Sequence, residues 1–287
     1  MIEEKILSQD DGSGSGFPYV MEPKVTFRII RSCNFDCPGC CTFSGRDRKG
    51  RVRNEDFRKV VDILADNRFS GILNISGGEP TLHEKLPELI RYASSGLGSS
   101  RIALFTNGDW IGEKGWEPLL EACFLSSNVL IRFSHDEQHL LGKAGAKGIA
   151  VNEVILEELR LQRSRKAAMF RGRMKELGAV PGVNFDFAFK GSMQEARSYM
   201  SDLGDVPVYL IKLRENPEKR PKEFGFLAVD VQENDDLLVY PTLGHIPENE
   251  PLGGVESLSE ALALNRKALR AEPKTDEQHQ WVRYDND

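Results

Sequence analysis

Short apolar runs recur along this chain from residue 25 onward, and residues typical of turns separate them. Runs of four to eight residues rich in Val, Ile, Leu and Phe are typical of buried strands. The pattern predicts six strands, over residues 25–30, 72–76, 102–106, 129–134, 183–189 and 206–213.

Apolar positions at helical spacing occupy the intervals between these runs, over residues 57–64, 86–93, 116–123 and 193–203. Strands that alternate with helices indicate parallel βαβ units. Six such units predict an α/β fold, a partial (β/α)6 barrel related to the TIM barrel. In such a barrel the ligands gather at the C-terminal ends of the strands.

Two stretches depart from this alternation. Residues 135–150 are rich in Gly, Ala and Lys and are expected to form a loop over the barrel mouth. Residues 160–175 hold seven basic residues and no acidic one. We interpret this basic stretch as a solvated helix face rather than an anion-binding surface, and both interpretations stay open.

The charge and the apolar runs of the chain limit the classes of partner that it is expected to bind. The chain has 287 residues and a formal net charge of −6, which counts against a nucleic-acid partner, because such proteins usually carry a basic excess. No apolar run is long enough to cross a membrane, and the first residues lack the core of a signal peptide. We therefore expect a cytoplasmic protein with no membrane partner, in which residues 1–23 form a flexible leader.

Four of the five cysteines fall within nine residues: Cys33, Cys37, Cys40 and Cys41. Such crowding favours a metal site in a reducing compartment over a disulfide framework. Gaps of three and two residues allow one loop to wrap three thiolates around an iron–sulfur cube, leaving one iron open. Structural zinc held by all four is the alternative, disfavoured because Cys40 and Cys41 are neighbours and cannot easily point at one tetrahedral centre. Cys123 lies on an apolar helical stripe and is expected in the core.

The motif Cys33-Asn34-Phe35-Asp36-Cys37-Pro38-Gly39-Cys40, directly after the first predicted strand, resembles the signature of the radical S-adenosylmethionine (SAM) superfamily. The resemblance extends over roughly residues 24–215. It implies one [4Fe–4S] cluster on Cys33, Cys37 and Cys40, with Cys41 a spare buried thiol. It also implies that SAM chelates the open iron and is cleaved to a 5′-deoxyadenosyl radical. An external electron donor such as flavodoxin or ferredoxin would supply the electron.

The resemblance also implies residues that hold SAM. Gly77, Gly78 and Glu79 match the motif that binds the amine of SAM. Asn107, Ser134 and Asp136 match positions near the cofactor. Lys190 or Arg214 could pair with the carboxylate of SAM, although surface salt bridges explain those two residues equally well. Gly39 departs from the family, which often has an aromatic residue there, so Phe43 or Phe105 is expected to contact the adenine. His135 and His139 are candidates for a substrate contact or a proton donor.

Residues 216–287 resemble the start of the auxiliary-cluster extension of many family members, but Thr242 stands where those have cysteine. We expect a small C-terminal cap without a cluster, after a barrel over residues 24–215. The expected activity is abstraction of a hydrogen atom from a small metabolite, sugar or nucleoside. A peptide substrate is the alternative, and a metal-stabilised binding protein is the non-enzyme alternative.

Overall fold

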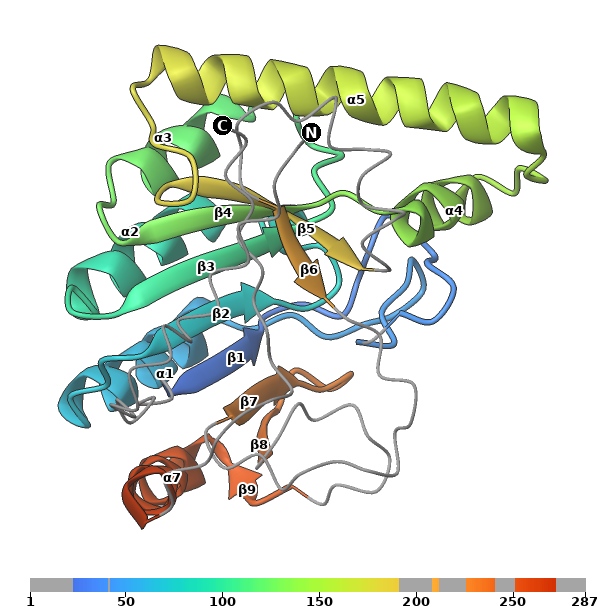
Figure 1. Cartoon of the computed structure of the whole chain (residues 1–287). Helices are drawn as coiled ribbons and strands as arrows, with labels where there is room; N and C mark the ends of the chain where they lie inside the picture. Colours follow the sequence, from blue (N-terminus) through green and yellow to red (C-terminus); the bar gives the residue numbers. More distant parts are fainter. Residues whose placement is uncertain (1–22, 41, 191–207, 212–225, 241–250, 272–287) are drawn as a thin grey trace, which may run out of the picture.

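The computed structural model describes residues 23–40, 42–190, 208–211, 226–240 and 251–271, and its core is a twisted parallel sheet (Figure 1). The six predicted strands are all present, in the spatial order β6-β5-β4-β3-β2-β1, and every neighbouring pair is parallel. This confirms the predicted α/β fold. The strands are β1 (Lys24–Arg28), β2 (Ile72–Ser76), β3 (Arg101–Thr106), β4 (Val129–Ser134), β5 (Phe185–Lys190) and β6 (Val208–Ile211).

Helices cover one face of this sheet. Figure 1 shows α1, α2 and α3 stacked along that face, while α5 runs along its β4–β5 end. Their apolar stripes pack with alternate strand residues into one core, to which α1 contributes Phe57, Val60, Val61 and Leu64, all 0% exposed. The helices are α1 (Asn54–Asp66), α2 (Leu86–Gly96), α3 (Glu117–Phe124), α4 (Glu137–Ala146) and α5 (Glu153–Glu176), with a short 3-10 helix η1 (Pro80–Leu82).

The opposite face of the sheet carries charged pairs. Arg28 of β1 donates to Asp230 at 2.8 Å, and both side chains are nearly buried. Arg132 of β4 makes two hydrogen bonds to Asp186 of β5, at 2.9 and 2.7 Å, with its guanidinium above the ring of Phe105. Two buried arginine–carboxylate pairs therefore lie on the face that the helices of the described residues leave uncovered.

The expected loop over residues 135–150 is wrong, because most of it is helix α4. Asp136 caps this helix by accepting a hydrogen bond from the His139 backbone N–H at 3.1 Å. The small residues Gly142, Ala144 and Ala146 are buried, so the composition that suggested a loop instead allows the helix to pack closely against its neighbours.

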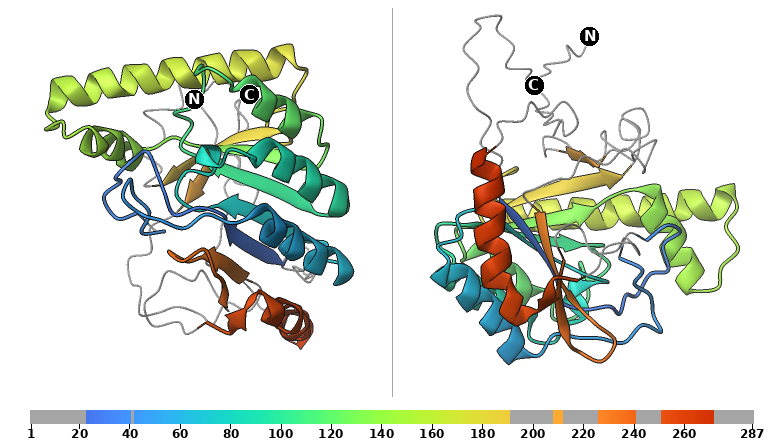
Figure 2. Two further views of the ribbon diagram at one scale, coloured as in Figure 1. Left: turned by 180° about the vertical axis from the view of Figure 1, so that it is seen from behind. Right: turned by 90° about the horizontal axis from the view of Figure 1, so that it is seen from below.

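The C-terminal segment continues the same sheet. Strand β7 (Phe226–Val231) pairs in parallel with β1, and β8 (Leu237–Tyr240) and β9 (Gly253–Gly254) extend the edge in antiparallel fashion. After the 3-10 helix η2 (Val255–Ser257), helix α7 (Leu258–Ala271) packs on α1 and β7 (Figure 2). Residues 226–240 and 251–271 thus add to the main core, and whether they also act as a cap stays a prediction.

Several sequence predictions fall outside the described residues: the leader 1–22, Cys41, the helix at 193–203, Arg214 and Thr242. Within the described part, no helix combines the length and the apolar composition needed to span a membrane.

Candidate functional site

The cysteine loop leaves the C-terminal end of β1 and is tied down by the chain that follows it. The Cys33 backbone N–H donates to Gly45 O at 3.1 Å, and the Arg31 N–H donates to Gly50 O at 2.9 Å. The Val52 N–H closes the segment by donating to Ile29 O at 2.8 Å. Residues 45–52 therefore run back along the entry to Cys33 and fix where its thiol projects.

The three predicted cluster ligands lie close enough for the charge on one thiol to affect the pKa of another. Burial raises the pKa of Cys33 to about 12, with a further upward contribution from Glu79 and then Cys40. Burial also raises the pKa of Cys37, and the charges of Cys33 and Cys40 add to that rise. Such thiols stay protonated at neutral pH until a cation replaces the proton. A metal group that carries several positive charges satisfies this requirement.

Hydrogen bonds to sulfur are already formed in the loop. The Phe35 N–H donates to Cys33 Sγ at 3.4 Å, and Asn107 Nδ2 approaches the same sulfur at 3.9 Å. Cys40 Sγ lies 3.2 Å from Thr42 Oγ1. Hydrogen bonds of this kind help to set the reduction potential of iron–sulfur clusters. A three-thiol donor set with N–H groups aimed at sulfur therefore fits a [4Fe–4S] cluster with one open iron.

No three His, Cys, Asp or Glu side chains in the described ranges are arranged to hold a single metal ion. One tetrahedral zinc ion needs its ligands about 2.3 Å from a common centre. An iron–sulfur cube distributes its thiolates over separate irons. The zinc alternative also needs Cys41, which lies outside the described residues, so the metal analysis proposed below decides between the two groups.

Gly77 and Gly78 allow the backbone after β2 to lie very close to the backbone of residues 30–32. A Cβ on Gly78 would lie 1.9 Å from Ser32 O, and one on Gly77 would lie 2.3 Å from Ile30 O. Gly77 also has φ of +137°, which disfavours any side chain. The Gly78 N–H donates to Ile30 O at 2.7 Å. These glycines thus dock the end of β2 against the residues that lead into Cys33.

Glu79 is 1% exposed and receives four hydrogen bonds. Oε1 accepts from the Thr81 N–H at 3.2 Å and from the hydroxyls of Thr81 and Thr106, each at 2.7 Å. Oε2 accepts from the Asn107 N–H at 2.7 Å. Burial raises the pKa of this carboxyl, although the four donors oppose the rise. Since each carboxylate oxygen offers about two lone-pair directions, Oε2 keeps one acceptor position, counting donors in the described residues.

Asn107 joins the end of β3 to the cysteine loop. Its Nδ2 donates to Asn34 Oδ1 at 2.8 Å, and its Oδ1 accepts from the Asp109 N–H at 3.0 Å. The predicted cofactor contact Asn107 therefore lies beside Cys33 and Glu79, as the alignment of parallel strand ends requires.

The two histidines at the end of β4 have different surroundings. His135 is 1% exposed and packs edge-on against the rings of Phe133 and Phe187. Burial, reinforced by the charge of Arg163, lowers its pKa to about 3, so it stays neutral. His139 is partly exposed, and its Nδ1 lies 2.7 Å from Asp136 Oδ1. Of the two candidates, His139 has the geometry of an oriented proton donor or acceptor.

Asp136 is buried at the start of α4, next to this histidine. Burial alone would raise the pKa of Asp136, but His139 and its hydrogen bonds lower it overall. Within the described residues, the His139 backbone N–H and the His139 ring both donate to Oδ1 of Asp136. The carboxylate therefore orients the histidine, and contact of Asp136 with a cofactor stays a prediction.

Arg163 is the residue that the sequence interpretation missed. It lies on α5 within the basic stretch, yet it is 5% exposed and its guanidinium sits 4.2 Å from the centre of the Phe133 ring. Its Nη1 donates to Asn107 O and its Nη2 to Ser134 O. Ser134 thus joins the site through its carbonyl, and one buried side of the predicted solvated helix faces the strand ends.

Other predicted positions are less closely joined to the site. Lys190 ends β5, and the position of its side chain is not described. Phe43 is 53% exposed, whereas Phe105 lies beneath Arg132. Gly39 has φ of +64°, a left-handed conformation that glycine adopts more readily than an aromatic residue does.

Comparison with known proteins gives three results. Residues 27–155 match the model of the Radical SAM superfamily. The antilisterial bacteriocin subtilosin biosynthesis protein AlbA of Bacillus subtilis (strain 168) is 34% identical over 110 residues, which cover 37% of this chain and 23% of that protein. GTP 3′,8-cyclase of Tolumonas auensis is 27% identical over 169 residues, covering 52% of this chain and 48% of the cyclase.

The matched stretches cover less than half the length of these two curated relatives. Among solved structures, native anSMEcpe with bound AdoMet has 16% sequence identity and a TM-score of 0.54, covering 84% of this chain and 80% of that one. This likeness shows a shared fold.

Proposed function

The chain is a member of the radical SAM superfamily, and we propose that it binds one [4Fe–4S] cluster through Cys33, Cys37 and Cys40 and cleaves SAM reductively. The observation that carries this proposal is the convergence of three half-buried thiols with Glu79 and Asn107 where β1, β2 and β3 end. When bound, the cluster supplies the electron that breaks the sulfonium bond, which yields the radical that abstracts a substrate hydrogen atom.

The protein's own groups hold and orient these partners. The free acceptor position on Glu79 Oε2 suits the ammonium group of SAM, because a hydrogen bond from a cationic donor to a carboxylate is stronger than one between neutral groups. Gly77 and Gly78 keep Glu79 in register with Cys33 through their contact with residues 30–32. The Asp136–His139 pair offers a proton donor or acceptor at the edge of the site. We propose that an external carrier such as flavodoxin or ferredoxin delivers the electron.

For the substrate we propose a polar small molecule, such as a metabolite, sugar or nucleoside. The charged pairs Arg28–Asp230 and Arg132–Asp186 make the uncovered face of the sheet polar, which favours a ligand rich in hydrogen-bonding groups. The cyclase relative is named for a nucleotide substrate. The relative named for subtilosin biosynthesis supports a peptide as the second candidate.

The test is anaerobic reconstitution with iron and sulfide, followed by incubation with SAM and dithionite. We expect about four irons and four sulfides per chain, and release of 5′-deoxyadenosine with methionine in equal amounts. Candidate substrates should raise the rate of this release. Zinc in place of iron in anaerobically purified protein, or SAM that stays intact, would overturn the proposal.

Replacing Glu79 by glutamine should weaken SAM binding while the cluster is retained. A charged hydrogen-bond partner is worth about 1.5–3 kcal/mol, which corresponds to roughly a tenfold to hundredfold rise in the dissociation constant. Isothermal calorimetry on the reconstituted protein measures it. Thr81→Ala is the matched control, because it removes the Thr81 hydroxyl donor to Glu79 and keeps the carboxylate charge. An unchanged dissociation constant in Glu79→Gln would remove Glu79 from the binding site.

A further inference from the structure

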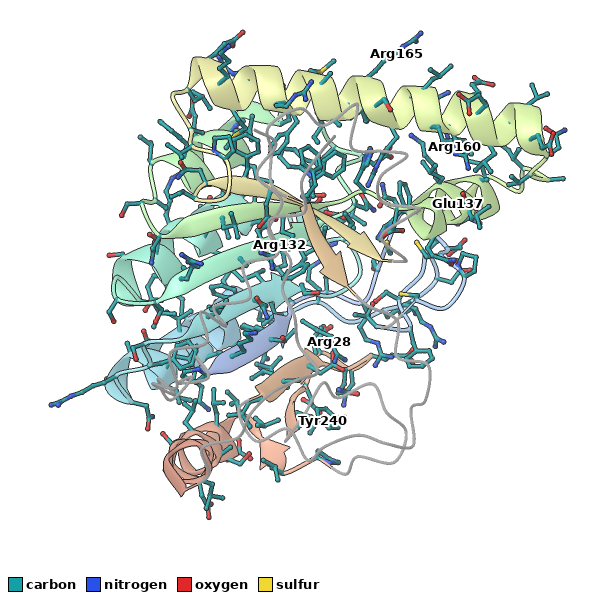
Figure 3. All side chains as sticks on the ribbon, in the orientation of Figure 1. Arg28, Arg132, Glu137, Arg160, Arg165 and Tyr240 are labelled. Atoms are coloured by element: carbon teal, nitrogen blue, oxygen red, sulfur yellow. The ribbon has the colours of Figure 1, made fainter. Side chains whose placement is uncertain are left out.

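Arg163 differs from the other arginines of α5 in where its charge lies. Figure 3 shows Arg165 pointing away from the molecule into solvent and Arg160 near Glu137, with which it forms a 2.9 Å ion pair. Arg163 instead points inward and is buried among Phe133, Asn107 and Ser134. One helix therefore presents basic side chains both to water and to the interior of the site.

The guanidinium links two strand ends. Its Nη1 and Nη2 donate to the carbonyls of Asn107, just after β3, and Ser134, the last residue of β4. Both residues were predicted to lie near SAM. Its Nε–H is buried and has no hydrogen-bond acceptor among the described residues. A buried donor without a partner destabilises the folded protein, so this placement of Arg163 requires a compensating gain.

The compensating groups are negative charges around the cysteine loop. Burial lowers the pKa of Arg163 to about 10, while Asp136, Asp109 and Glu79 act against that fall and favour the charged form. Asn107, whose carbonyl accepts from Arg163, also approaches Cys33 Sγ with its Nδ2 at 3.9 Å, so the guanidinium lies close to the cysteine loop. Two lysines near Arg163, Lys143 and Lys166, both form ion pairs with Asp109.

We propose that Arg163 is a positioning residue that fixes the ends of β3 and β4 and places a buried positive charge beside the cysteine loop, where it raises the reduction potential of the cluster. The inference rests on the proposed function. The reduced cluster carries one more negative charge than the oxidised one, so a nearby buried cation stabilises the reduced form more. Weak screening in the protein interior makes this effect larger than that of a surface charge.

The test is an anaerobic redox titration of the reconstituted cluster, followed by electron paramagnetic resonance, in the wild type and three variants. Arg163→Met removes the charge and keeps much of the apolar stem. We expect it to disfavour reduction by about tenfold, a shift of 59 mV to more negative potential for a one-electron couple. Arg163→Lys keeps the charge and should restore most of the potential. Arg165→Met, the solvent-facing control on the same helix, should leave the potential at the wild-type value.

The two roles separate in a second measurement. Lysine cannot reach both carbonyls with a rigid fork, so Arg163→Lys should weaken SAM binding by calorimetry while keeping the potential. Wild-type potential in Arg163→Met, or equal shifts in the methionine and lysine variants, would overturn the electrostatic role. Should Arg163→Met lose its circular dichroism signature, Arg163→Gln takes its place in the same comparison. A wild type that forms no cluster would refute the proposed function itself, whereas a wild-type cluster indifferent to Arg163 would refute only this inference.

Discussion

Alanine in place of Cys33, Cys37 or Cys40 abolishes the iron–sulfur absorbance and the release of 5′-deoxyadenosine together. Three thiolates are the smallest protein ligand set that leaves one iron open, so two cannot hold the same site. Each single variant should therefore fall to background in iron, sulfide and SAM cleavage after anaerobic reconstitution. The loss in activity is complete rather than graded, which makes this one of the two largest effects expected from single substitutions.

Two other cysteines provide the controls. Cys123 lies on the buried face of α3 and is 2% exposed, and Cys123→Ala should keep the cluster while losing some stability through the small cavity it leaves. Cys41→Ala is predicted to keep both the cluster and the activity. Full iron content in any one of the three ligand variants, or loss of the cluster in Cys41→Ala, would show that the ligand set is assigned wrongly.

The strands of the barrel could be predicted from the sequence because each is a short run between turns that places apolar residues at the positions facing the helices. In β1, Val25 and Phe27 are fully buried in the main core, whereas Thr26 and Arg28 alternate with them on the uncovered face. The cysteine spacing was also readable, because a loop motif depends on residues close in sequence. Both features are local in the chain.

Arg163 was missed because its stretch was interpreted by charge density. The buried residues of α5 are Leu159, Arg163, Ala167, Phe170 and Met174, which recur every three or four positions. Arg163 therefore lies on the apolar stripe of the helix, and this periodicity was the signal that could have identified it. A basic residue on such a stripe needs a buried acceptor, and only the fold supplies the Asn107 and Ser134 carbonyls.

Other features depend on contacts between distant segments. The glycines at 77 and 78 were predicted to help hold SAM, which stays a prediction; in the structure they bring the backbone close to Ile30 and Ser32. Helix α4 was mistaken for a loop because its glycines, Gly142 and Gly145, have low helix propensity. Its packing surface is the cysteine loop itself, as the Asp36 N–H, which donates to Gly142 O at 3.0 Å, shows.

Gly142→Ala should reduce cluster assembly severely. An added Cβ at this position would lie 2.4 Å from Cys37 Sγ, 2.8 Å from its Cα and 2.9 Å from its N. Two of these three contacts involve backbone, which cannot rotate away, so either α4 or the cysteine loop must shift. Overpacking of this kind typically costs about 1–3 kcal/mol or more. Iron and sulfide content after reconstitution, with the thermal unfolding midpoint of the apoprotein, measures both effects.

Gly145→Ala is the matched control, one turn further along the same helix. Its Cβ would lie 3.5 Å from Asp36 O and 3.9 Å from Asp36 Cβ, which is ordinary van der Waals contact. Alanine favours a helix over glycine by about 1 kcal/mol, so both substitutions should stabilise α4 intrinsically. Loss of the cluster in Gly142→Ala alone therefore traces to the contact with Cys37 rather than to the helix. Equal cluster content in the two variants would mean that α4 does not fix the loop that carries the ligands.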